Sequence, residues 1–305
     1  RKIGSTGLRA ISKIISMLLG LGASDIQKAF DRACLQGRLE TARLLFAQGA
    51  GLPRGCIMGP CETLNADGLK LLLELGAEFC DESGSRLAPL ALILQTYSRN
   101  PQGKSRCLHA AASEGLTLPK TAPFEVLTRD FSGLSARFLH EPEAINRTHH
   151  LDDFYPLSLG CSEDRNLALH GAPLEGGTLL HLSIDNGDLE MAGFLLEKGA
   201  DPNARASVDE EGFGGHTALY GALVSQPFRV GRDSTGLAEL LLKAGIDTTP
   251  RATLRKSLRF VEDESEHIYQ EVTALEFAER FHDQDWVNPK AFELVRQQSV
   301  QDLPG

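Results

Sequence analysis

A histidine and two carboxylates lie within four residues of one another near the C-terminus, in the segment RFHDQDWVN (280–288). A histidine beside carboxylates can transfer protons as a general acid or base, and the same groups can ligate a metal ion. His282, Asp283 and Asp285 are therefore the residues on which a hydrolase or a metal-dependent enzyme would depend.

The same segment also has a structural interpretation, which we favour. Asp283 or Asp285 caps a helix, while Phe281 and Trp286 close the end of a helical stack. The segment follows the first helix of a helix pair, on the side away from the connecting loops. We therefore expect His282 to point away from His216 and from His267.

Two other groups have metal-binding residue types. His149, His150, Asp152 and Asp153 cluster in one polar segment, and four residues separate Cys56 from Cys61, without a neighbouring histidine. Exposed histidines and aspartates in loops are usually solvated, and the six cysteines form no CxxC pair, which favours reduced thiols in an intracellular protein. The sequence also lacks a Gly-rich phosphate loop, a Gly-x-Ser-x-Gly elbow and a His-Glu-x-x-His motif. We expect no enzyme activity, no metal and no cofactor.

The elements that must position these residues are short paired helices. The stretch GGTLLHLSIDNGDLEMAGFLLEKGADPNARA (176–206) predicts one helix after Thr178 and a second after Asp188, with Gly187 and Gly199 ending them. Two helices of two to three turns each cannot enclose a core by themselves. The pair must therefore stack against other pairs.

Parts of this pattern recur along the chain. The endings LLFAQGA, LLELGA, LLEKGA and LLKAGI occur from Leu44 to Ile246, and the starts TLLHLSI, TALYGAL and TALEFAE begin at Thr178, Thr217 and Thr273. The irregular spacing between copies indicates connecting loops of unequal length.

The stretch 176–206 resembles an almost complete ankyrin repeat, with Leu179 where proline is usual, and 214–249 resembles a second. Weaker copies lie at about 26–53, 54–81, 87–119, 121–146 and 273–298. The resemblance implies an all-α ankyrin-repeat solenoid of about seven helix-turn-helix units with long loop insertions. It also gives the domain organisation: an N-terminal capping helix over 1–25, an array over 26–298 and a C-terminal tail over 299–305.

In the resembled motif the histidine three residues after the threonine is structural. His181 is thus expected to bond the Thr178 hydroxyl and the backbone of the adjacent repeat. Tyr220 and Glu276 occupy the matching positions in the next two copies. The bonds between the last repeats must therefore differ.

Composition and charge limit the partners. The formal net charge of −10 over 305 residues argues against a nucleic-acid-binding surface, which needs a basic stripe. No stretch is long and apolar enough to span a membrane. Leu8, Ile11, Ile15 and Leu18 share one face of the predicted N-terminal helix, although this stretch also resembles the apolar part of a secretory signal. We expect a monomeric cytoplasmic protein.

Three insertions interrupt the array, at about 146–176, 226–236 and 249–272. Long loops in compact arrays tend to be functional. The third insertion places Arg251, Arg255, Lys256 and Arg259 before Glu262, Asp263, Glu264 and Glu266. Such a division of charge predicts an antiparallel finger or a short helix whose arms attract each other, either as a recognition element or as a self-neutralising turn.

The resemblance implies protein binding without chemistry, through a concave groove and its protruding loops. We expect a protein or peptide partner. The residues expected to contact it lie on the first helices and on the finger: Phe213, His216, Tyr220, Arg255, Arg259, Phe260, Glu262, Glu264, His267 and Tyr269.

Overall fold

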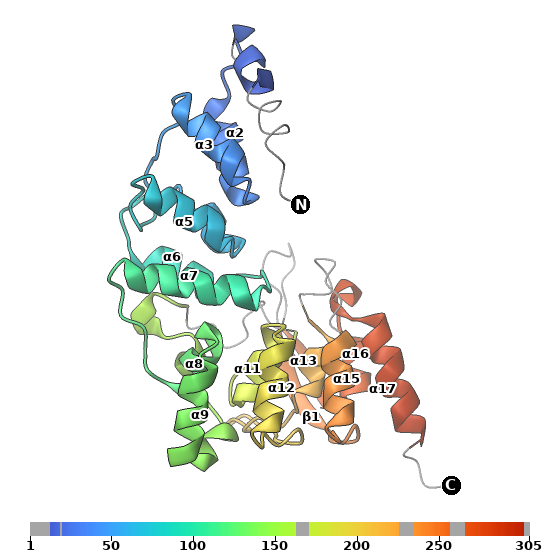
Figure 1. Cartoon of the computed structure of the whole chain (residues 1–305). Coiled ribbons are helices and arrows are strands. Elements are labelled where there is room, and N and C mark those ends of the chain that lie inside the picture. The colour runs from blue at the N-terminus through green and yellow to red at the C-terminus, as the bar shows by residue number, and fades with distance from the viewer. Residues whose placement is uncertain (1–12, 19, 163–170, 226–234, 257–265, 302–305) are drawn as a thin grey trace. The chain divides into compact units, whose positions relative to one another are not determined.

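The computed structural model describes residues 13–18, 20–162, 171–225, 235–256 and 266–301, and this part of the chain is predominantly helical (Figure 1). Contacts divide the chain into two compact units. The N-terminal unit comprises residues 1–96 and 106–117, and the C-terminal unit comprises residues 97–105 and 118–305. Each unit is built from helix pairs.

The N-terminal unit contains three helix pairs, which correspond to the predicted copies at 26–53, 54–81 and 87–119. The first helices pack against one another, and α5 also packs against α2 and α3. The pairs are α2 (Ile26–Leu35) with α3 (Leu39–Ala47), α4 (Met58–Glu62) with α5 (Ala66–Glu74), and α6 (Leu87–Gln95) with α7 (Pro101–Ser113).

Asn65 joins two of these pairs. Its side-chain oxygen caps α5 by accepting from the Gly68 N–H at 3.1 Å, and its amide nitrogen donates to the carbonyls of Cys34 and Leu35 at 3.0 Å. These bonds satisfy an exposed helix start and a helix end at once. A single asparagine therefore fixes how the second pair stacks on the first.

The N-terminal segment is helical over residues 13–18, within the region predicted to cap the array. Ile14, Met17 and Leu18 are 52, 60 and 48% exposed. Among the described residues, these three side chains do not pack into the stack, and the capping role over 1–25 stays a prediction.

The C-terminal unit contains four helix pairs, which correspond to the predicted copies at 121–146, 176–206, 214–249 and 273–298. Second helices begin at capping side chains such as Asp130, Asp188 and Asn288. The pairs are α8 (Ala122–Thr128) with α9 (Phe131–His140), α11 (Leu179–Asp185) with α12 (Leu189–Glu197), α13 (Leu219–Leu223) with α15 (Thr235–Lys243), and α16 (Ala274–Arg280) with α17 (Pro289–Gln301).

The described part of the fold is mostly helical, as predicted, and the third insertion adds a small two-stranded hairpin. Strand β1 (Ala252–Lys256) pairs antiparallel with β2 (His267–Val272). Side chains of β1 alternate between buried and half-buried, as expected when one face of a ribbon lies on a helical core. Of the two predicted forms of this insertion, the antiparallel finger is confirmed and the helix is wrong.

The described residues of the first insertion form the short helices α10 (Leu151–Phe154) and η2 (Leu157–Leu159), which follow η1 (Pro142–Ile145). Most of the second insertion, including Arg229 and Arg232, lies outside the described residues. Helix α17 continues to Gln301, so the predicted tail at 299–305 begins inside a helix.

Residues 97–105 belong to the C-terminal unit through buried polar bonds. The Arg99 guanidinium donates to the Asp185 carbonyl at 2.7 Å, and Lys104 Nζ donates to Asn186 Oδ1 at 2.7 Å. Buried charged groups of this kind are stable only when they have hydrogen-bond partners. None of the described helices is long and apolar enough to cross a lipid bilayer.

Candidate functional site

The β1–β2 hairpin is the most prominent feature that the third insertion adds to the array. Arg255 pairs with Ile268, and Leu254 pairs with Tyr269. Leu254 and Tyr269 are buried, whereas Ile268 is 53% exposed and Gln270 is also exposed. The hairpin therefore has one face on the core and an outer face that carries an apolar side chain.

The base of the hairpin is bonded to the helices beneath it. The Tyr220 hydroxyl, on α13, lies 2.6 Å from the Val272 carbonyl and 3.0 Å from the Pro250 carbonyl. Arg251 forms a two-pronged ion pair with Glu276 of α16, at 2.7 and 2.9 Å. These bonds hold the base of the hairpin on α13 and α16.

His282 does not point away from His267, and that expectation is wrong. The two imidazole rings stack with their centroids 3.8 Å apart and their planes 8° apart. The Tyr269 hydroxyl donates to His282 Nδ1 at 2.7 Å and accepts from the His282 backbone N–H at 3.2 Å. Because the insertion folds back as a hairpin, it brings β2 over the end of α16, which the order of elements along the chain did not reveal.

The electrostatics of this stack keep His282 neutral. Burial, together with the nearby His267 and Lys256, lowers the pKa of His282 to about 4. With Nδ1 occupied by the Tyr269 hydroxyl, Nε2 carries the proton; it is enclosed and has no hydrogen-bond partner among the described residues. A substrate proton has no evident route to either nitrogen, so the geometry does not favour a catalytic base here.

The two aspartates of the same segment lie at the start of a short 3-10 helix. Asp283 accepts from the Asp285 N–H at 3.1 Å and thereby starts η3 (Gln284–Trp286), while Asp285 is exposed. The cap of the second helix, α17, is Asn288 rather than either aspartate. Burial of Phe281 and Trp286 agrees with their predicted place in the end of the stack.

The histidines and aspartates of the first insertion make local contacts, including His149 Nδ1 at 3.7 Å from Asp153. His150 Nδ1 bonds Glu175 at 2.8 Å, Asp153 accepts from the His150 N–H, and Asp152 accepts from the Leu157 N–H. Over the described part of the chain, no three His, Cys, Asp or Glu side chains are placed to share a metal ion.

Phe213 and Arg255 do come together, next to the hairpin. The Arg255 guanidinium lies over the Phe213 ring at 4.4 Å, pairs with Asp209 at 2.9 Å and also contacts Glu211. A guanidinium held in this way presents an already neutralised surface. Arg255 therefore orders the loop before α13 more than it offers a free charge to a partner.

His216 and Tyr220 were expected to face a partner, but each is only 1% exposed. His216 Nε2 donates to the Pro173 carbonyl at 2.9 Å, and burial lowers its pKa to about 3. Tyr269 is likewise 95% buried. Arg259, Phe260, Glu262 and Glu264 lie outside the described residues, so their contact with a partner stays a prediction.

The structural role expected for His181 is confirmed. Its Nδ1 accepts from the Thr178 N–H at 3.1 Å and lies 2.9 Å from the Thr178 hydroxyl. Its Nε2 then carries the proton, which it donates to the His216 carbonyl of the next pair at 3.2 Å. As expected, Tyr220 and Glu276 make different bonds at the matching positions.

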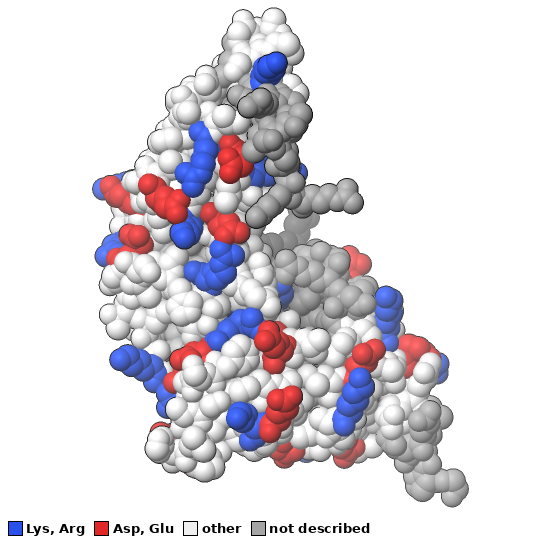
Figure 2. All heavy atoms as spheres, viewed as in Figure 1, with Lys and Arg blue, Asp and Glu red and all other residues white. Residues whose placement is uncertain are grey.

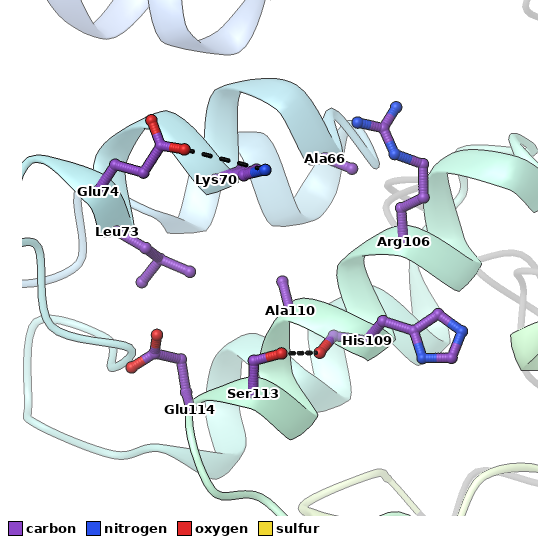
Figure 3. Close-up of a pocket in the computed structure, with 9 residues that line it drawn as sticks. All are labelled: Ala66, Lys70, Leu73, Glu74, Arg106, His109, Ala110, Ser113 and Glu114. Carbon is purple, nitrogen blue, oxygen red and sulfur yellow. Dashed lines mark hydrogen bonds and ion pairs between the residues drawn. The ribbon is translucent and has the colours of Figure 1, made fainter.

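The N-terminal unit has a groove that the sequence did not predict (Figure 3). It is a groove of about 530 Å³ between α5 and α7. Its lining residues are Ala66, Lys70, Leu73, Glu74, Arg106, His109, Ala110, Ser113 and Glu114. No motif marks this groove in the sequence, because small residues on separate helices create it.

Charge on the visible face is mixed. In Figure 2, basic and acidic side chains alternate over the described helices rather than gathering by sign. Surface pairs such as Arg43 with Glu74, at 3.0 Å, account for part of this pattern.

Comparison with known proteins supports one segment directly. The family model described as "Ankyrin repeat" matches residues 175–207. A comparison with curated protein sequences finds no match.

Among solved structures, the ankyrin repeat domain of human ASB11 is 17% identical and covers 93% of this chain and 100% of its own, with a TM-score of 0.34. The ankyrin repeat domain of Bcl-3, described as a unique member of the IkappaB protein family, is also 17% identical and covers 90% of this chain and 99% of its own, with a TM-score of 0.25. With TM-scores this low, neither likeness says which surfaces correspond.

The helix pairs and their capped turns define the class, a protein of stacked helical hairpins. Residues 175–207 match the ankyrin-repeat family and include one helix pair of this stack, α11 with α12.

Proposed function

We propose that this chain is a non-catalytic binding protein that holds a polypeptide partner through the β1–β2 hairpin and the surface beside it. Ankyrin-repeat domains generally serve as interaction scaffolds, and a stack of helix pairs offers an extended surface for this purpose. The observation that carries the proposal is the outer face of the hairpin, where Ile268 is 53% exposed on a strand bonded to two helices.

A rigid strand with an exposed apolar side chain is a suitable anchor for a partner. The strand is already ordered in the free protein, because Tyr220 and Arg251 fix the base of the hairpin. Binding therefore costs little conformational entropy in this strand. Phe213, half-buried and in contact with the Arg255 guanidinium, lies next to this outer face, because Arg255 pairs with Ile268 across the hairpin. The charged residues at 257–265 would add electrostatic selection of the partner.

The test replaces only residues 257–265 by a short Asn-Gly turn, because removing the whole insertion would also take away the carbonyls that Tyr220 bonds. Partners are captured from native lysate with the parent chain, the shortened chain and an Ile268→Ser variant, and are identified by mass spectrometry. We expect the same partner to be lost from both variants while the helical circular dichroism spectrum is unchanged.

A matched control is Leu139→Ser, which alters an exposed leucine at the end of α9, 81% exposed. This variant should keep the partner. If the parent and both hairpin variants capture identical sets of proteins, the hairpin is not the binding site.

A further inference from the structure

The groove of the N-terminal unit lies between two second helices that run in the same direction. In Figure 3, α5 runs from Ala66 to Glu74 and α7 from Arg106 to Glu114, side by side. The two helices are not among the closely packed pairs of this unit. Small side chains, Ala66 and Ala110, leave the space, and Leu73 completes an apolar floor.

The charges along this groove are polarised. Glu74 and Glu114 lie at its carboxyl end, whereas Arg106 and His109 lie towards its amino end. Helix carboxyl ends already carry partial negative charge, and basic residues usually offset it. Neither α5 nor α7 has a basic residue in its last turn, so the carboxylates add to the two helix dipoles.

Internal ion pairs offset only part of this field. Arg43 lies 3.0 Å from Glu74, Lys70 lies 3.9 Å from the same carboxylate, and Asp67 pairs with Arg106. Within the described residues, the Glu114 carboxylate and the His109 ring have no ion-pair or hydrogen-bond partner of their own. These two groups remain available, one at each end of the groove.

We propose that the groove between α5 and α7 binds a short amphipathic helix of a partner protein, oriented antiparallel to both helices. The amino-terminal turn of the bound helix, carrying Lys or Arg, lies at Glu114 and Glu74. Its carboxyl-terminal turn, carrying Asp or Glu, lies at Arg106 and His109. Aliphatic side chains spaced three or four residues apart rest on Leu73, Ala66 and Ala110.

The dimensions and the charges both select this occupant. From Arg106 to Glu114 the helix rises about 12 Å, which matches about two turns of a third helix. When the bound helix runs antiparallel to α5 and α7, its dipole points opposite to theirs. Its terminal charges are then opposite in sign to the charges beside them in the groove. The contact is small, so binding is transient rather than permanent. This surface uses no residue of the β1–β2 hairpin and is independent of the function proposed above.

The test uses two fluorescein-labelled helical peptides of about 14 residues, or about 21 Å of helix. Both carry Leu at every third or fourth position; one has two Lys in its first turn and two Glu in its last, and the other has these charges exchanged. Fluorescence polarisation with the full chain at low salt should show about tenfold tighter binding of the Lys-first peptide. Raising the salt to about 0.5 M should reduce this preference.

Variants of the full chain locate the effect. His109→Glu combined with Glu114→Arg should abolish or invert the preference, and Leu73→Glu should remove binding of both peptides. Glu40→Arg, the same substitution as Glu114→Arg but at an exposed position on α3, should leave the preference intact. Circular dichroism confirms that each variant remains folded.

Three results would overturn the proposal. The first is that the two peptides bind with equal affinity. The second is that neither peptide saturates the chain at about millimolar concentration. Alternatively, light scattering shows a dimer of the chain that Leu73→Glu restores to a monomer, in which case the occupant is a second copy.

Discussion

At the start of three successive first helices, the third residue after a threonine differs in each. His181 follows Thr178, Tyr220 follows Thr217, and Glu276 follows Thr273. His181 and Tyr220 both bond the backbone of a following element. The His181 imidazole donates to the His216 carbonyl, and the Tyr220 hydroxyl donates to the Val272 carbonyl at the base of the β-hairpin. Glu276 instead returns to the Thr273 N–H at 2.9 Å and pairs with Arg251.

The difference between these positions teaches how an array accommodates an insertion. Residues 198–218, which connect α12 to α13, place the His216 carbonyl within reach of the His181 imidazole. Where the connection is the long insertion at 249–272, a longer side chain with a terminal hydroxyl spans the gap. The bond between neighbouring repeats therefore depends jointly on the side chain and on the length of the loop it must reach.

The largest expected effect comes from removing the tyrosine. Tyr220 is fully buried against Phe277, with ring centroids 5.6 Å apart. Tyr220→Ala should lower the free energy of unfolding by about 3–5 kcal/mol, because it leaves a cavity and two carbonyls without their donor. Urea unfolding followed by circular dichroism measures this loss.

Two further substitutions of Tyr220 separate the contribution of its ring packing from that of its hydrogen bonds. Tyr220→Phe should cost only about 1–2 kcal/mol. Tyr220→His restores the residue of the neighbouring repeat, but its ring is too short to reach Val272, so it should remain clearly less stable than the parent chain. Parent-like stability of Tyr220→His would contradict the link between side-chain length and insertion.

The next effect is a loss of stability in acid. Burial lowers the pKa of His181 to about 4, from its usual value of 6.5. Because the folded pKa is the lower one, the unfolded chain binds the proton more readily. This contribution, up to about 3 kcal/mol, is present above pH 6.5 and is lost as the pH falls towards 4.

His181→Gln isolates this titration. The variant should be less stable than the parent chain at pH 7.5, and the difference should shrink on going to pH 5, where most unpaired carboxylates are still ionised. A difference that stays constant between pH 7.5 and 5 would show that the protonation of His181 does not differ between the folded and unfolded chains.

A smaller effect is expected at the third position of the comparison. Glu276→Gln keeps a side chain that can cap Thr273, but it removes the ion pair with the half-exposed Arg251. Stability should fall by about 0.5–1 kcal/mol, and less at high salt. A loss as large as that of Tyr220→Ala would mean that this ion pair, rather than the tyrosine, holds the hairpin.

The smallest effect belongs to the outer face of the hairpin. Ile268→Ser should change the free energy of unfolding by no more than about 0.5 kcal/mol, since the side chain is half exposed and bonds nothing beneath it. The same urea titration measures it. A clearly larger loss would mean that Ile268 supports the fold rather than a partner.

Local signals in the sequence were sufficient for the helix pairs. Thr178, Gly187 and Gly199 marked the boundaries of one repeat, and His181 made the bonds that its position implied. The antiparallel finger was among the predicted forms, since the charge division and the length of the insertion suggested it.

The sequence did not predict which segments lie side by side in the array. His282 and His267 are 15 residues apart in sequence, yet they stack because the hairpin folds back over the end of α16. The groove between α5 and α7 depends on the relative rotation of two helices, which Ala66 and Ala110 do not encode in any local pattern.

The hydroxyl of Tyr220 has a consequence for cooperativity. In a simple stack each repeat can open at the cost of one interface, but here α13, the β-hairpin and α16 share one buried hydroxyl and one ion pair. These elements should open together, with similar amide-exchange protection, as one block. A ligand that binds the hairpin would then stabilise the last two repeats together, by an amount that grows with the ratio of its free concentration to its Kd.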